Sequence, residues 1–236
     1  MVLVHGLMGF DEIAFAGQRR EYFRGVRDRL EDLGADVRVV KVSAFAPVEV
    51  RAQQLADAIH AVDAKKVNLI AHSLGGLDAR YAIAKLKLAP KIASLVTIGT
   101  PHRGTPLADF GTRVGDRLSM RRVLEALGMN LSVFYGLTTQ QMALFNQQVP
   151  DVRGVWYSCL LARADTGLHP LLLPVHRLLR RHSGENDGIV PFSSQRWGEV
   201  VAEVEADHWA QIGWNKGFDA PSLYARILEE LKARGL

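Results

Sequence analysis

Residues 67–76 read Val-Asn-Leu-Ile-Ala-His-Ser-Leu-Gly-Gly, an apolar run that leads into a serine. The run predicts a buried strand, and we expect the chain to continue as a helix after Gly76. Two positions away from Ser73, on either side, stand the small residues Ala71 and Gly75. A strand that turns sharply into a helix brings its two backbone segments together around a strained residue, so small side chains are needed there. The stretch therefore predicts a strand, a tight turn that carries Ser73, and a helix.

Similar apolar runs alternate with segments of helical period along the rest of the chain. The predicted strands are residues 2–4, 37–42, 67–71, 95–99, 155–160 and 200–204, and the clearest predicted helices are residues 19–33, 47–62 and 223–231. Strands that are apolar on both faces and alternate with helices favour a parallel sheet with helices on both sides. We expect an α/β fold, a single domain over residues 1–236, with about six mostly parallel strands.

Residues 111–150 do not fit this alternation, because they have a helix-like pattern without an obvious strand. We expect a helical insertion here. It is either a layer that packs permanently or a movable lid over a site, and an apolar stripe looks the same in both cases.

Composition and charge exclude several classes of protein. The chain has 236 residues, 48% hydrophobic and 23% charged, as in an ordinary globular protein. No apolar run is long enough for a transmembrane helix. The net charge of +4 is spread along the chain without a basic stripe and stacking aromatics, so no nucleic-acid partner is expected. Because Cys159 is the only cysteine, an intramolecular disulfide and a Cys-rich zinc site are excluded.

A serine becomes a nucleophile only beside a base, which in turn needs an acid to orient it. His208 follows the last predicted strand, where a loop can carry it to the carboxyl edge of the sheet. His102, after the strand at residues 95–99, is the competing base, whereas His5 is expected to shape a loop. We therefore expect His208 to be the base.

The pattern leaves the acid open between Asp187 and Asp165, with Asp187 favoured. Asp165 follows the strand at residues 155–160, and Asp187 stands in the later stretch Ser-Gly-Glu-Asn-Asp-Gly-Ile-Val-Pro at residues 183–191. Two lesser candidates are Glu185 and Asp207, the latter because a residue next to His208 normally points elsewhere.

Residues 71–76 resemble the G-x-S-x-G nucleophile elbow of α/β-hydrolases, with Ala71 in place of the first glycine. Five blocks in succession resemble the true bacterial lipases of the Pseudomonas and Burkholderia type: residues 5–10, 71–76, 97–105, 184–191 and 207–208. The resemblance implies the α/β-hydrolase fold and cleavage of carboxylic esters, triacylglycerols above all, through an acyl-enzyme.

The resemblance also assigns the site. It implies Ser73 as nucleophile, Asp187 as acid and His208 as base, with an oxyanion hole formed by the backbone N–H groups of Leu7 and Leu74. It places a helical lid at residues 111–150. Alternatives that use the same triad are a carboxylesterase, a thioesterase and a polyhydroxyalkanoate depolymerase. An inactive binding module is disfavoured because all three triad residues are present in order.

The chain departs from the family in two respects. Family members often hold calcium through an aspartate two residues after the catalytic histidine and contain a disulfide, whereas here Ala210 occupies that position and Cys159 is alone. We therefore expect no cofactor. The resemblance implies a lipid or ester substrate at an oil–water interface and a secreted enzyme, although the chain as given carries no signal peptide. The oligomeric state is not indicated.

Overall fold

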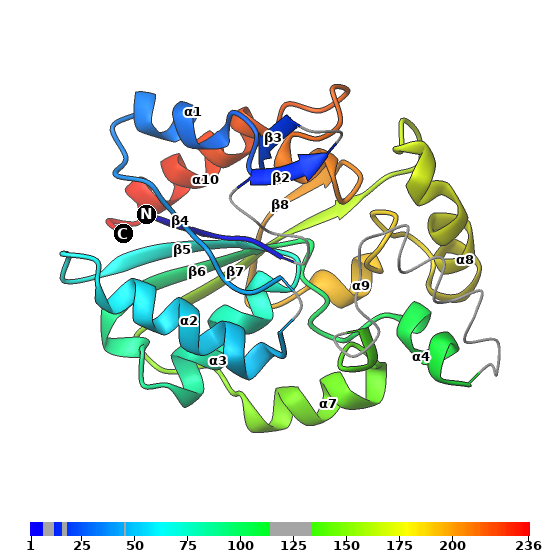
Figure 1. Ribbon diagram of the computed structural model, residues 1–236, viewed down its shortest axis with the longest axis horizontal. Coiled ribbons are helices and arrows are strands. Elements are labelled where there is room, and N and C mark those ends of the chain that lie inside the picture. The colour runs from blue at the N-terminus through cyan, green and yellow to red at the C-terminus, as the bar shows by residue number, and fades with distance from the viewer. Residues whose placement is uncertain (7–11, 16–17, 45, 114–133) are drawn as a thin grey trace.

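A computed structural model describes residues 1–6, 12–15, 18–44, 46–113 and 134–236 of the chain. Its centre is a six-stranded parallel sheet with the strand order β4-β1-β5-β6-β7-β8 (Figure 1). The strands are β1 (Val2–Val4), β4 (Arg38–Val40), β5 (Val67–His72), β6 (Ile92–Ile98), β7 (Trp156–Arg163) and β8 (Glu199–Glu205). All six lie where the apolar runs predict them, so the expected α/β architecture is confirmed.

Helices cover both faces of the sheet, as Figure 1 shows. One face packs against α1 (Val26–Asp32) and α10 (Ala220–Ala233), and the other against α2 (Val48–His60) and α3 (Gly75–Lys85). Strand residues alternate between these layers: Leu3 and Ile70 belong to the first core cluster, whereas Val4 and Leu69 belong to the second. This two-residue period follows from the pleat of a strand.

Shorter elements gather at the carboxyl ends of the strands. They are α4 (Pro106–Arg113), α7 (Thr139–Gln148), α8 (Leu173–Ser183) and α9 (Phe192–Gln195), with short 3₁₀ turns at Pro170–Leu172 and Ala210–Ile212. A further 3₁₀ turn, Ala89–Lys91, precedes β6 at the opposite edge of the sheet. Apolar side chains of α4, α7 and α8 form a third buried cluster together with Leu74 of the turn after β5 and Leu77 of α3. No helix in the described part of the chain is long and apolar enough to cross a bilayer.

The prediction of one helix over residues 19–33 is wrong in its first part. Strand β3 (Gln18–Glu21) pairs antiparallel with β2 (Glu12–Phe15), and α1 begins only at Val26. Gly25 precedes the helix with a φ of +67°, a left-handed conformation that interrupts a right-handed helix. Tyr22 and Phe23 are spaced four and three residues from Val26, as in a helix, which is why the sequence predicts one here; both are instead buried in the turn before α1.

The predicted insertion at residues 111–150 is described only at its two ends. Helix α4 reaches Arg113, and α7 occupies Thr139–Gln148. Residues 114–133 lie outside the described residues. The helical lid therefore stays a prediction.

Candidate active site

Ser73 occupies the turn between β5, which ends at His72, and α3, which begins at Gly75. Its φ is +56°, in the left-handed region that residues other than glycine rarely adopt. A Cβ atom on Gly75 would lie 2.7 Å from the carbonyl oxygen of Val4, and one on Gly6 would lie 2.6 Å from the Cβ of Ser73. Close backbone approach thus explains the small residues around this serine.

Three side chains from separate loops meet at this turn. Nε2 of His208 lies 3.0 Å from Oγ of Ser73, and Nδ1 of His208 lies 2.7 Å from Oδ2 of Asp187. Because a carboxylate can only accept, Nδ1 carries a proton toward Asp187, which leaves Nε2 able to accept the serine proton. Both Asp187 and His208 are buried, and Ser73 is partly exposed.

Asp187 is held by more than the histidine. Its Oδ1 accepts hydrogen bonds from the backbone N–H groups of Ile189 (3.0 Å) and Val190 (2.7 Å), and its Oδ2 accepts a second one, from Nε2 of Gln211 (2.9 Å). The backbone carbonyl of Asp187 also accepts from the N–H of His208, at 2.8 Å. These bonds fix the carboxylate in orientation and compensate its burial.

Leu74, one of the two expected oxyanion donors, is the N-cap residue of α3. A backbone N–H at the start of a helix has no acceptor within the helix and points toward incoming negative charge. Leu7, the other expected donor, lies outside the described residues.

The competing histidines lie elsewhere. His102 is fully buried, with Nε2 3.1 Å from Oγ1 of Thr97 and its ring stacked on Trp197. His5 accepts a hydrogen bond from the N–H of Val42 through Nε2, so its Nδ1 donates to the carbonyl of Gly6. That geometry agrees with a role in shaping the loop.

The other carboxylates are also engaged away from His208. Asp165 is exposed and forms an ion pair with Arg180, and Glu185 lies 3.5 Å from Arg163. Asp207 is buried, but it caps the following turn instead of contacting the ring of its neighbour.

Arg51 is a site residue that the sequence reasoning missed. It is fully buried, and its guanidinium donates to the Asp78 carboxylate at 2.8 Å and to the carbonyls of His5 (2.9 Å) and Gly6 (3.2 Å). It therefore secures the turn that precedes Leu7. Burial raises the pKa of Asp78 to about 6, although Arg51 lowers it. The available signal was an arginine within the buried stripe of α2.

Comparison with known proteins places the chain among enzymes. It is 33% identical to a triacylglycerol lipase of Pseudomonas fragi over 291 residues, which covers 100% of this chain and 97% of that protein. It is 35% identical over 245 residues to triacylglycerol lipase 2 of Saccharomyces cerevisiae, with coverage of 91% and 74%. The chain belongs to the triacylglycerol lipase family. It is accordingly a carboxylic ester hydrolase.

Solved structures confirm the fold of this lipase family member. A Bacillus licheniformis lipase in its mature form superposes with a TM-score of 0.78 at 23% identity, covering 96% of this chain and 90% of that one. A metagenomic carboxyl esterase gives a TM-score of 0.82 at 21% identity, with coverage of 99% and 75%. The α/β-hydrolase fold is thereby established. Residues 1–147, more than half of the chain, also match the family of palmitoyl protein thioesterases. The chain therefore belongs to that family as well.

Calcium, which the lipase resemblance suggests, does not fit the loop after His208. The Asp207 carboxylate accepts hydrogen bonds from four donors: the N–H groups of Trp209 (2.9 Å), Ala210 (2.7 Å) and His169 (2.8 Å), and Nδ2 of Asn215 (2.9 Å). A cation would have to displace these donors, and Ala210 brings no ligand. Among the residues that the structure describes, no group of three or more His, Cys, Asp or Glu side chains could hold a metal ion.

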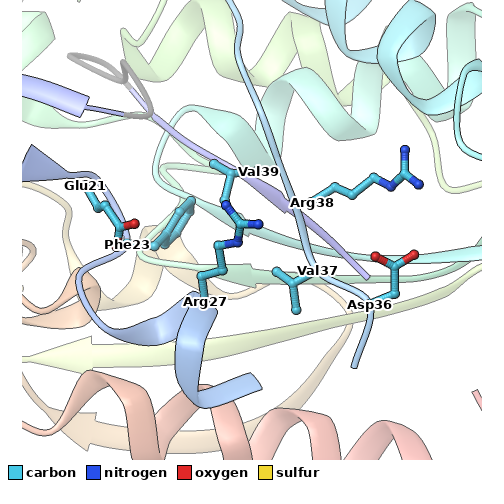
Figure 2. Close-up of a pocket in the computed structure, with 7 residues that line it drawn as sticks. All are labelled: Glu21, Phe23, Arg27, Asp36, Val37, Arg38 and Val39. Atoms are coloured by element: carbon cyan, nitrogen blue, oxygen red, sulfur yellow. The ribbon is translucent and has the colours of Figure 1, made fainter. Parts of the chain in front are cut away.

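A surface hollow of about 390 Å³ lies against α1 and the start of β4, and none of the proposed catalytic residues lines it. Figure 2 shows Glu21 and Phe23 on one side of it, Asp36 and Arg38 on the other, and Arg27 between them. Asp36 precedes β4 and therefore marks the amino edge of the parallel sheet, opposite the edge that carries the triad. The hollow is not a place from which an ester could reach Ser73.

Proposed function

We propose that the chain hydrolyses triacylglycerols through an acyl-enzyme on Ser73, with His208 as general base and Asp187 as its orienting acid. The observation that carries the proposal is the continuous relay from Oγ of Ser73 through the His208 ring to Oδ2 of Asp187. The proposed substrate class, triacylglycerols, comes from the names of the relatives. The chain matches 97% of the length of one of these triacylglycerol lipases and 88% of another.

The first half of the reaction transfers the acyl group. His208 takes the proton of Ser73 on Nε2 while Oγ attacks the ester carbonyl, and the carbonyl oxygen becomes an oxyanion. Collapse of the tetrahedral intermediate breaks the bond to the alcohol, which leaves with the proton from Nε2. Asp187 keeps Nδ1 protonated and stabilises the transient imidazolium.

Water then completes the cycle in the same way. His208 takes a proton from the water, the hydroxide attacks the acyl-enzyme carbonyl, and Ser73 leaves with the proton as the carboxylic acid is released. The N–H of Leu74, with that of Leu7 as the expected second donor, receives the oxyanion in both halves. Loss of one such donor typically costs about 10²–10³ in rate.

The direct test uses Ser73→Ala. We expect turnover of a soluble butyrate ester to fall by about 10⁴-fold or more, and labelling by a fluorophosphonate probe to disappear. A wild-type chain that neither turns over esters nor reacts with the probe would refute the proposal.

Thioester cleavage is a second candidate, favoured by the match of residues 1–147 to palmitoyl protein thioesterases. The same acyl-enzyme chemistry serves both substrates, since only the leaving group differs. Competition between palmitoyl thioester and emulsified triacylglycerol, measured as the ratio of kcat/KM, discriminates between them.

Action at an oil–water interface is part of the proposal. It requires that residues 111–150 move as a lid, whose apolar face would cover the site in water and open on lipid. We expect the rate on a triacylglycerol to rise abruptly when its concentration passes the solubility limit. Activity that follows the dissolved substrate alone would make the chain a carboxylesterase with a fixed helical layer.

A further inference from the structure

Among the residues that the structure describes, two buried polar atoms beside the triad have no hydrogen-bond partner: Nε2 of His72 and Oε1 of Gln211. Both residues are fully enclosed. The ring of His72 lies against that of His208, with their centroids 4.5 Å apart. Because leaving a buried donor or acceptor unpaired is costly, these two atoms call for an explanation.

The hydrogen bonds from Gly6 to Tyr22 and from Tyr22 to His72 indicate which nitrogen of His72 carries the proton. The backbone N–H of Gly6 donates to Oη of Tyr22 at 3.1 Å, and Oη lies 2.8 Å from Nδ1 of His72. Donation of its single proton to Nδ1 gives the hydroxyl both an incoming and an outgoing hydrogen bond, whereas the reverse direction would leave that proton without an acceptor among the described residues. Burial lowers the pKa of His72 far below its ordinary value, so the ring is neutral. Its one proton is therefore on Nε2.

The amide of Gln211 is fixed from the side of the triad. Its Nε2 donates to Oδ2 of Asp187 at 2.9 Å, because the carboxylate can only accept. The remaining polar atom, Oε1, is an acceptor and lies close to Gly99, where an added Cβ would come within 2.3 Å of it. Burial lowers the pKa of His72 most, while the Gln211 side chain and the backbone of His208 both raise it. The two atoms without partners are thus a donor and an acceptor that complement each other.

We propose that Tyr22, His72 and Gln211 form a buried hydrogen-bond relay that ties the Asp187 carboxylate to the turn at Gly6, next to the expected oxyanion donor. The direction of donation is Gly6 to Tyr22, Tyr22 to His72, His72 to Gln211, and Gln211 to Asp187. The three side chains are positioning residues, and the relay rests on the proposed roles of Ser73, Asp187 and His208.

The relay has an electrostatic consequence for the reaction. His208 carries positive charge in the transition state, and a second charged imidazole at 4.5 Å would oppose it. A relay that uses both nitrogens of His72 in the neutral form keeps that charge away. Gln211 also donates to Oδ2 of Asp187, the oxygen that His208 contacts, and so fixes the position of that oxygen beside the ring.

The test combines two variants with a matched control. Gln211→Met keeps the side-chain size but removes the donor to Asp187, and Tyr22→Phe removes the hydroxyl that orients His72. The control is Tyr224→Phe in α10, because Tyr224 is also a buried tyrosine but its hydroxyl has no partner within the described part of the chain. All are assayed on a soluble butyrate ester, after melting curves show a folded protein.

We expect Gln211→Met to lower kcat about 10-fold with little change in KM, as for the loss of a hydrogen bond to a charged group. The acid limb of the kcat/KM profile should move to higher pH, because the less neutralised Asp187 holds the His208 imidazolium more strongly. Tyr22→Phe should lower kcat several-fold, and the double variant should lose less than the product of both effects. Tyr224→Phe should match the wild type.

The tautomer of His72 gives a readout that a packing role would not affect. We expect ¹⁵N spectra of histidine-labelled protein to show His72 as a neutral ring protonated on Nε2. Protonation on Nδ1, an unshifted pH profile in Gln211→Met, or fully multiplicative losses in the double variant would each overturn the relay. Failure of the proposed function is separate, since it appears as a wild type that fluorophosphonate does not label.

Discussion

Two aspartates that follow β7 have opposite surroundings. Asp187 is fully buried and its carboxylate receives four hydrogen bonds, whereas the side chain of Asp165 is half exposed and pairs with Arg180 on α8. Asp165 is nearer to the end of the strand, yet it faces outward. The comparison teaches that the donors which converge on a carboxylate, and not its distance from a strand, qualify it to orient a histidine.

The largest effect should separate these two residues directly. We expect Asp187→Asn to lower kcat/KM on a soluble butyrate ester by about 10⁴-fold, because an amide in that place favours the wrong tautomer of His208. Asp165→Asn should change it less than twofold, since an exposed ion pair contributes little. Comparable losses in the two variants would undo the assignment of the acid.

A smaller effect is expected on the free energy of unfolding, which should fall more in Asp207→Ala than in Asp165→Asn. Asp207→Ala leaves four donors without their acceptor in a buried loop, so we expect the free energy of unfolding to drop by about 2–4 kcal/mol. That corresponds to a lower Tm by roughly 5–15 °C for a chain of this size. Asp165→Asn provides the matched control, with an expected loss under about 1 kcal/mol. Equal Tm values for the two variants would show that the buried bonds do not hold the loop.

The sequence predicted the strands of the sheet and the elbow at Ser73 because both depend on local patterns, apolar period and small residues. It could not predict the hydrogen bond from Gln211 to Asp187, because the two residues lie in different loops, 24 positions apart. A single glutamine belongs to no hydrophobic repeat and to no motif, so nothing in the sequence points to its contacts. The same limit explains the error at residues 19–25, where the spacing of Tyr22 and Phe23 imitates a helix but tertiary burial decides their place.

Burial of titratable groups also makes the free energy of unfolding depend on pH. Burial lowers the pKa of His5 to about 4, and the pKa values of His72 and His102 lie far below the ordinary 6.5. Below pH 6.5 the unfolded chain binds three protons that the folded chain excludes, so stability falls as the pH falls. Burial raises the pKa of Asp78 to about 6, which offsets one of these protons between pH 6 and 4. Two protons per molecule then remain, and the net expectation is a loss of roughly 3 kcal/mol per pH unit in this window.

Urea unfolding at pH 7, 6 and 5 measures this slope. His102→Gln serves as the control, because the variant excludes one proton fewer and should roughly halve the dependence between pH 6 and 5. A free energy of unfolding that stays constant from pH 7 to 5 would contradict the burial of these histidines in their neutral form.

The smallest expected effect is that of a chelator. The loop beside His208 is held by the four donors to Asp207, and the position where relatives of the lipase type offer a carboxylate is Ala210. N–H groups and a methyl group cannot serve as calcium ligands. The hydrogen bonds to Asp207 therefore stabilise this loop without a cation. We expect EDTA to leave both kcat and Tm unchanged, whereas Asp207→Ala lowers Tm in either buffer. A loss in EDTA that calcium reverses would mean that oxygens elsewhere in the chain bind the ion, and the stability of the loop would then have two independent sources.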